Sequence, residues 1–291
     1  MDHRAWLATL TADQKASLTT RSNAAGLWHL AGHGGAILGV GAAIAMAVPG
    51  WWALLPVQGV LIVFLFTLEH EATHKTPFAS ERLNEWVGRL CGLALILPFG
   101  WFRYFHLAHH RWTNIEGRDP ELAGGKPETK AAWVWHVSGL PYWIASLRLI
   151  AALLRGRAEG DYLPAGALPR IVAEARLMAL AYLSIAVLAG PLALWVWAVP
   201  VLLGQPVLRL YLLAEHGDCP RVADMFLNTR TTFTNRIVRF VAWNMPYHAE
   251  HHVYPNVPFH QLPLLHGLMR DRLGVTADGY AAFTAAYLAR R

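Results

Sequence analysis

A long run without charge limits what this chain can fold into. From Ala24 to Leu68, 45 residues contain no Lys, Arg, Asp or Glu, and Pro49-Gly50 lies near the middle. One bilayer crossing takes about 20 apolar residues. The run therefore predicts a helical hairpin, with spans at about 24–48 and 51–69 and a turn at the Pro-Gly pair.

A second apolar run extends from about Ile171 to Leu213, with Gly190-Pro191 near its centre. It predicts a second hairpin, with spans at about 171–189 and 192–213. The composition supports membrane spans, because only 15% of the residues are charged, against about 25% in soluble domains. Buried helices of a soluble protein are the alternative, but two runs of double length are hard to place in a soluble core.

The basic residues predict the orientation. Three precede the first hairpin, twelve lie between the hairpins, eight follow the second, and neither tight turn contains one. The remaining two, Arg176 and Arg209, lie towards the ends of the second run, where long side chains can reach water. The positive-inside rule places both termini in the cytoplasm. We expect one multi-pass membrane domain over residues 1–291, with a cytosolic cap formed by 70–170 and 214–291.

The apolar stretch 83–99 is expected to be a helix at the membrane surface, and 131–147, broken at Gly139 and Pro141, an interfacial or re-entrant helix. Gly35 and Gly39 form a GxxxG motif, which predicts close packing of the first span against another helix. The two cysteines cannot form a disulfide framework or a zinc ribbon. Neither a nucleotide site nor nucleic-acid binding is indicated.

Nine of the fifteen histidines fall in four short groups. The groups are HEATH (His70, His74), HLAHH (His106, His109, His110), EH (His216) and HAEHH (His248, His251, His252). Residues three and four apart share a helix face, so each box presents imidazoles side by side. All four groups lie on the same predicted side of the membrane. Nine imidazoles exceed the needs of one zinc ion and suit two metals such as iron.

The order and surroundings of the boxes resemble the membrane-bound fatty acid desaturase and hydroxylase superfamily. The resemblance rests on HEATH after a span, on FHLAHHRWTN followed by DPEL, and on YHAEHHVYPNVPFHQLP, over about Leu68 to Leu264. It implies an all-α membrane protein with four transmembrane helices and a cytosolic helical cap. It also implies that all nine histidines hold two iron ions, with O2 as co-substrate and a lipid or acyl chain as substrate.

One position departs from a branch of that superfamily. Acyl-CoA desaturases carry an Asn four residues before the last-span histidine, and this chain has Leu212 there. The departure favours acyl lipids over acyl-CoA. No fused electron-transfer region is recognised, so the resemblance implies a separate donor such as a ferredoxin or a cytochrome b5-type protein.

Carboxylates and amides beside metal-bound histidines often orient their rings. Four candidates lie in or near the boxes: Glu71, Glu215, Glu250 and Asn244. Asp119 is expected to hold its loop by pairing with Arg111 or Arg118. His29 and His33 lie four residues apart in the first span; haem binding is conceivable, but packing against neighbouring side chains is the expected role.

The predicted function is O2-dependent oxidation of a membrane lipid, with desaturation of an acyl lipid as first choice. The same site could instead hydroxylate a fatty acid or a lipid headgroup, or oxidise a carotenoid. A membrane metal-binding or transport protein is the alternative of another class. Such a protein needs polar ligands deep within its spans, whereas these histidines follow the span ends.

Overall fold

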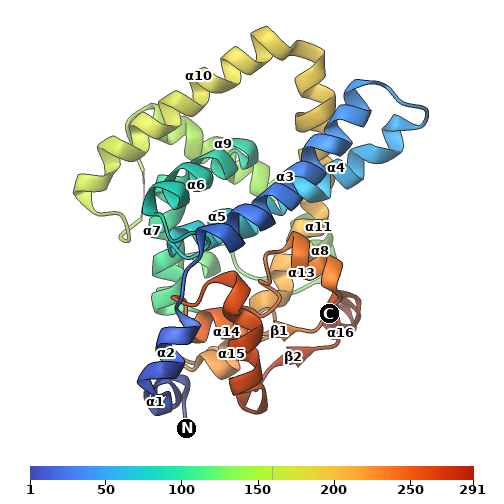
Figure 1. Cartoon of the computed structure of the whole chain (residues 1–291). Helices are drawn as coiled ribbons and strands as arrows, with labels where there is room; N and C mark the ends of the chain where they lie inside the picture. The colour runs from blue at the N-terminus through green and yellow to red at the C-terminus, as the bar shows by residue number, and fades with distance from the viewer. Residues whose placement is uncertain (159) are drawn as a thin grey trace.

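The protein is mainly helical in the computed structural model, which describes residues 1–158 and 160–291. Figure 1 shows long helices in the upper part and shorter N- and C-terminal elements below them. Among the described residues, three helical segments are long and apolar enough to cross a membrane, or up to five if each bent pair counts as one span. Their outer faces carry bare apolar side chains such as Leu188, which is 86% exposed, as a lipid-facing surface would.

The first apolar run folds into helices joined at a glycine turn. Helix α3 (Asn23–Ala45) begins where the Ser22 side chain accepts a hydrogen bond from the Ala25 backbone N–H. The chain reverses at Gly50, whose φ of 77° lies in the left-handed region. The return limb consists of η1 (Trp51–Leu54), α4 (Leu55–Val63) and α5 (Leu65–Thr73). Because α4 packs on α3, the structure agrees with the predicted hairpin.

The second apolar run forms 52 residues of nearly continuous helix, Ala165–His216, more than twice the length of one crossing. Its elements are η3 (Ala165–Ala167), α10 (Leu168–Ala193), the π-helical η4 (Leu194–Ala198) and α11 (Val199–His216). Gly190 has non-helical torsions, φ 43° and ψ −123°. In Figure 1 the chain rises along α10, bends over and descends into α11. The spans expected at 171–189 and 192–213 are therefore one bent helical stretch without a separate loop.

Two bent helix pairs lie between these segments. They are α6 (Glu81–Leu95) with α7 (Phe99–Trp112), bent by 99°, and α8 (Lys130–Val137) with α9 (Leu140–Leu154), bent by 53°. The helix expected at 83–99 ends at Leu95, because Ile96 adopts a left-handed φ of 59°. The predicted break in 131–147 is confirmed at Gly139, where φ is 75°. The short η2 (Pro120–Leu122) lies in the connection between the pairs.

The N- and C-terminal segments pack together in the lower part of Figure 1, and both chain ends lie there. Their elements are α1 (His3–Thr9), α2 (Ala12–Leu18), α12 (Met225–Asn228), β1 (Thr231–Thr232), α13 (Arg236–Val241), α14 (His248–Val253), η5 (Phe259–Gln261), α15 (Leu262–Met269), η6 (Arg270–Arg272), β2 (Thr276–Ala277) and α16 (Tyr280–Ala289). The parallel pairing of β1 with β2 is a small departure from the all-α prediction. Cytoplasmic orientation of the termini remains a prediction.

Helices α4 and α11 meet backbone to backbone at Gly59 and Gly204. A Cβ added to Gly59 would lie 2.1 Å from the Pro200 carbonyl oxygen, and one added to Gly204 would lie 2.4 Å from the Gly59 carbonyl carbon. In contrast, nothing lies within 4 Å of a Cβ added to Gly35 or Gly39. The prediction that the GxxxG motif packs closely is therefore wrong, because the tight helix contact uses glycines on two other helices.

The variant Gly59→Ala should lower the free energy of unfolding by about 1–3 kcal/mol, because the added methyl group overlaps backbone atoms that cannot move aside. Gly39→Ala is the matched control, since the same methyl group enters open space in an apolar helix and improves helix propensity. Thermal unfolding of the detergent-purified variants measures the difference. Equal unfolding temperatures would contradict the close contact.

Candidate metal centre

The ends of four helices bring the box histidines to one place. His70 lies in the last turn of α5, and His74 is its C-cap. Helix α7 carries the second box, His216 is the last residue of α11, and α14 carries the third box. Because residues three and four apart share a helix face, each box turns its rings towards the same centre. All nine histidines of the four groups gather in two adjoining sets.

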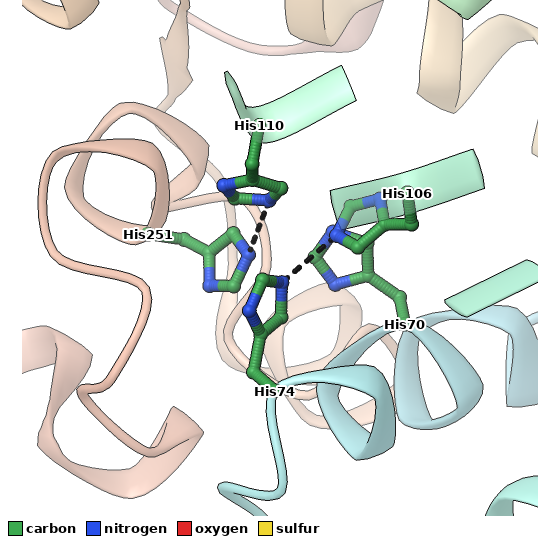
Figure 2. Close-up of side chains that lie close together, drawn as sticks. All are labelled: His70, His74, His106, His110 and His251. Carbon is green, nitrogen blue, oxygen red and sulfur yellow. Dashed lines mark hydrogen bonds between the residues drawn. The ribbon is translucent and has the colours of Figure 1, made fainter. Parts of the chain in front are cut away.

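The first set contains five histidines from three helices. They are His70, His74, His106, His110 and His251, and one ligand atom of each lies within 4.8 Å of the others. Figure 2 shows their rings converging on a common point. The Nε2 atoms of His74 and His106 are 2.9 Å apart, and those of His110 and His251 are 3.2 Å apart.

The second set contains His109, His216 and His252, with His248 beside them. The Nε2 atom of His216 lies 3.1 Å from Nε2 of His109 and 3.1 Å from Nε2 of His248. The two sets adjoin, because the rings of His110 and His252 stack with centroids 4.0 Å apart. The arrangement provides two neighbouring clusters of imidazole nitrogens.

The donor set fits metal ions. Two nitrogens bound at right angles, each about 2.1 Å from a metal, lie about 3.0 Å apart, and the closest Nε2 pairs are 2.9 and 3.1 Å apart. Both ring nitrogens of His70 are buried without a hydrogen-bond partner among the described residues, although buried polar atoms normally have one. A metal ion in the five-histidine set would give one of these two nitrogens a partner.

The three rings of the third box can bind a metal without losing a proton first. Burial lowers the pKa of His251 to about 3 and holds the pKa values of His248 and His252 well below their ordinary range. A neutral imidazole is the form that coordinates metals. Around neutral pH these histidines therefore carry a free lone pair.

Oxygen atoms lie beside the outward Nδ1 atoms, which leaves Nε2 for the centre. Four such pairs are His216 with the Asn228 carbonyl at 3.2 Å, His252 with the Thr113 hydroxyl at 3.2 Å, His251 with Glu71 at 3.3 Å, and His248 with Glu215 at 3.4 Å. Glu71 and Glu215 thus lie where the sequence placed candidate orienting groups. The contacts from Asn228 and Thr113 were not anticipated.

Asp119 provides the fifth and best-formed of these contacts. It does not pair with Arg111 or Arg118 as expected; its Oδ1 lies 2.9 Å from Nδ1 of His109, while its Oδ2 accepts a hydrogen bond from the Asn114 backbone N–H at 2.7 Å. Burial alone would raise the pKa of Asp119, but the hydrogen bonds from His109 and from backbone N–H groups hold it below its ordinary value. A carboxylate at this site orients the His109 ring.

The other two candidate orienting groups bond elsewhere. Glu250 lies 2.5 Å from Nδ1 of His266 and accepts a hydrogen bond from the Thr231 hydroxyl. Asn244 donates from its side-chain amide to the Phe259 carbonyl at 3.0 Å. Both contacts tie the segment around the third box to the chain that follows it, so these two residues act on the position of α14. Within the part of the chain that the structure describes, neither side chain bonds to a box histidine.

His29 and His33 have structural partners. Nε2 of His29 lies 2.7 Å from the Phe240 carbonyl, and its ring packs against that of Trp243. His33 is buried, with Nε2 2.9 Å from the Leu61 carbonyl and Nδ1 accepting from the Trp243 indole N–H. These contacts agree with the expected packing role and leave no free pair of nitrogens for a haem.

An apolar cavity of about 400 Å³ lies against the histidines. Its apolar lining includes Phe66, Leu97, Trp101, Phe102, Phe105, Leu149, Leu212 and Leu213. Four of the nine histidines also line it: His70, His106, His109 and His248. A hydrocarbon chain in this cavity would therefore touch both clusters of ring nitrogens. The departure at Leu212 puts an apolar side chain on the cavity wall.

The family model of fatty acid desaturases matches residues 49–284, which is most of the chain. The chain belongs to the fatty acid desaturase family. The matched range contains all nine histidines and the cavity residues. Family membership therefore agrees with the resemblance on which the site was predicted.

Two relatives illustrate the range of the chain's similarity to known proteins. It is 32% identical over 118 residues to an sn-1 oleoyl-lipid 12-desaturase of Picosynechococcus sp., covering 37% of this chain and 34% of the relative. It is 26% identical over 201 residues to the sphingolipid delta(4)-desaturase/C4-monooxygenase DES2 of Mus musculus, covering 67% of this chain and 58% of the relative. The chain thus spans between a third and three fifths of the length of these relatives.

Proposed function

We propose that this protein is an integral membrane di-iron enzyme that desaturates the acyl chain of a lipid with O2. The nine histidines would hold two iron ions, and iron bound there would supply the activation of O2. The chain's own residues orient the rings, line the cavity with hydrocarbon and keep water away from the substrate. Two electrons would come from a separate donor of ferredoxin or cytochrome b5 type.

One observation carries this proposal: the wall of the cavity is mostly apolar, and four of the nine histidines line it. An apolar chain enters such a cavity because burial of hydrocarbon is favourable. Its carbons would then lie directly against the two histidine sets. The relatives are named as desaturases of oleoyl lipids and sphingolipids, which favours a lipid enzyme over a membrane metal transporter.

The membrane arrangement is part of the proposal. Four spans would arise from α3, from the limb η1–α4–α5, and from the two limbs of the bent stretch that joins α10 to α11. The cap would comprise the segments 70–170 and 214–291, with the metal centre and both termini in the cytoplasm. The distribution of basic residues supports this orientation. One buried core runs from the N-terminal helices to the C-terminal segment, which supports a single domain.

Hydroxylation is the second candidate. The name of one relative gives it both a delta(4)-desaturase and a C4-monooxygenase activity. Desaturation and hydroxylation are thus both named for that relative. Removal of two hydrogen atoms gives a double bond, whereas insertion of one oxygen atom gives an alcohol. Placement of the substrate carbon within the cavity would decide between them.

Lipid mass spectrometry of cells with and without the gene tests the proposal. We expect one lipid class to lose two hydrogen atoms when the protein and an electron donor are present. A gain of one oxygen atom instead would support hydroxylation. Cells expressing a folded His251→Ala variant serve as the control, because they contain the same membrane protein without an intact histidine set. If lipids and carotenoids are unchanged while an active electron donor is present, the proposed enzyme function is contradicted.

A further inference from the structure

Arg209 is a partly buried cation in the wall of the cavity. Its Nε atom is buried and has no hydrogen-bond partner among the described residues. None of the ion pairs in the part of the chain that the structure describes includes it. Its guanidinium lies over the ring of Tyr142, 4.6 Å from the centroid. A partly buried guanidinium that faces a cavity and takes part in no ion pair offers free N–H donors to an anionic ligand.

The fold holds the partly exposed Arg209 side chain against the cavity. The Tyr142 hydroxyl donates to the Leu95 carbonyl at 3.1 Å, which fixes the ring beneath the guanidinium. At the break between α8 and α9, a Cβ added to Gly139 would lie 2.8 Å from Cβ of Gln205, one turn before Arg209. This close approach holds the break between α8 and α9 against α11.

The carboxylates that line the same cavity face the histidines. Glu121 lies 3.8 Å from Nδ1 of His109, and Glu215 lies 3.4 Å from Nδ1 of His248. Both are therefore near the metal centre rather than paired with Arg209. Lys126 also lines the cavity, so the wall includes a second cation besides Arg209.

The position of Arg209 on α11 relates it to the metal centre. Arg209 and His216 are seven residues apart on one helix, which puts them on nearly the same face and about 10 Å apart along the axis. Leu212 and Leu213 lie between them and line the cavity. An acyl chain with its polar end at Arg209 would pass these two leucines before it reached the histidines.

We propose that Arg209 binds an oxyanion at the polar end of the acyl substrate and thereby selects which carbon reaches the metal centre. The inference rests on the proposed function, because it assumes that the cavity receives an acyl chain. The guanidinium fork matches both a carboxylate and a phosphate. The oxyanion could therefore be the carboxylate of a free fatty acid or the phosphate of a lipid headgroup.

Equilibrium binding of three oleoyl probes to the purified full-length protein in neutral detergent tests this proposal. The probes are oleate, oleoyl-lysophosphatidate and the neutral lipid monoolein. The wild type should bind at least one anionic probe about 10-fold or more tightly than monoolein, because hydrogen bonds to charged groups are the strong ones. Preference for oleate indicates a fatty acid carboxylate, and preference for the lysophosphatidate indicates a headgroup phosphate.

Arg209→Gln should bind all three probes with similar affinity, and Arg209→Lys, which keeps the charge but loses the fork, should retain part of the preference. Arg148→Gln is the control, since Arg148 is exposed on α9, and it should behave like the wild type. If Arg209→Gln fails to fold, the probe preferences of the wild type and of Arg209→Lys still test the proposal. Equal binding of the three probes by the wild type, an unchanged preference in Arg209→Gln, or no binding of any probe would overturn the proposal.

Binding needs no turnover, so the two proposals can fail separately. If the wild type prefers an anionic probe but cells show no oxidised lipid, the Arg209 site is supported and the desaturase function is contradicted. If cells contain oxidised lipid but the wild type binds the three probes equally, the enzyme function is supported and the Arg209 site is contradicted.

Discussion

His251→Ala should retain only about one iron per chain and should lose at least about 100-fold in lipid oxidation, since even residues that merely contact metal ligands cost 10–100-fold when replaced. His251 is fully buried within the five-histidine set, with Nε2 3.2 Å from that of His110. Its loss leaves the set around His216 complete. Iron should therefore fall by half while activity, which needs both sets, nearly disappears.

His260→Ala is the matched control, because His260 lies in the same C-terminal segment but in neither histidine set. It should keep its iron and its activity. Iron is measured by elemental mass spectrometry after dialysis, and thermal unfolding checks that both variants are folded. Full iron content together with full turnover in His251→Ala would show that this residue is no ligand.

Asp119→Asn should weaken iron binding by about 10–100-fold, the usual cost of losing an orienting carboxylate. The carboxylate lies 2.9 Å from Nδ1 of His109 and also accepts hydrogen bonds from the backbone N–H groups of Asn114 and Glu121. The amide of asparagine has a single acceptor oxygen and no negative charge, so it cannot serve all three donors. The His109 ring would then turn more freely and bind iron less firmly.

Competition with a chelator of known affinity measures this change. Glu116→Gln is the control, because Glu116 lies on the same loop, is exposed, and pairs only with Arg221 among the described residues. It should bind iron as the wild type does. Asp119→Asn with wild-type iron affinity and activity would contradict an orienting role for this carboxylate.

Features that depend on local spacing could be predicted from the sequence. The boxes place their histidines three and four residues apart, which puts the rings on one helix face, and the ends of α5 and α11 follow from the apolar runs. The convergence of nine rings then needs only that these helix ends meet. The paired limbs of the first hairpin were predictable for the same reason.

Features that depend on distant contacts could not be predicted. Asp119 contacts His109 because the loop after α7 folds back towards it, a path that the intervening residues do not encode. The GxxxG motif indicates small side chains but does not identify the helix that packs on them. The close helix contact therefore lies at Gly59 and Gly204 and not at the motif. No local signal in the sequence shows that the guanidinium of Arg209 lies over the ring of Tyr142.

The iron content of the purified wild-type protein tests the central claim most directly. Elemental mass spectrometry on protein from iron-replete cells should give about two iron atoms per chain, in line with two adjoining sets of imidazole nitrogens. Less than one metal atom per chain in protein that still oxidises lipid, or two zinc atoms in fully active protein, would contradict the account.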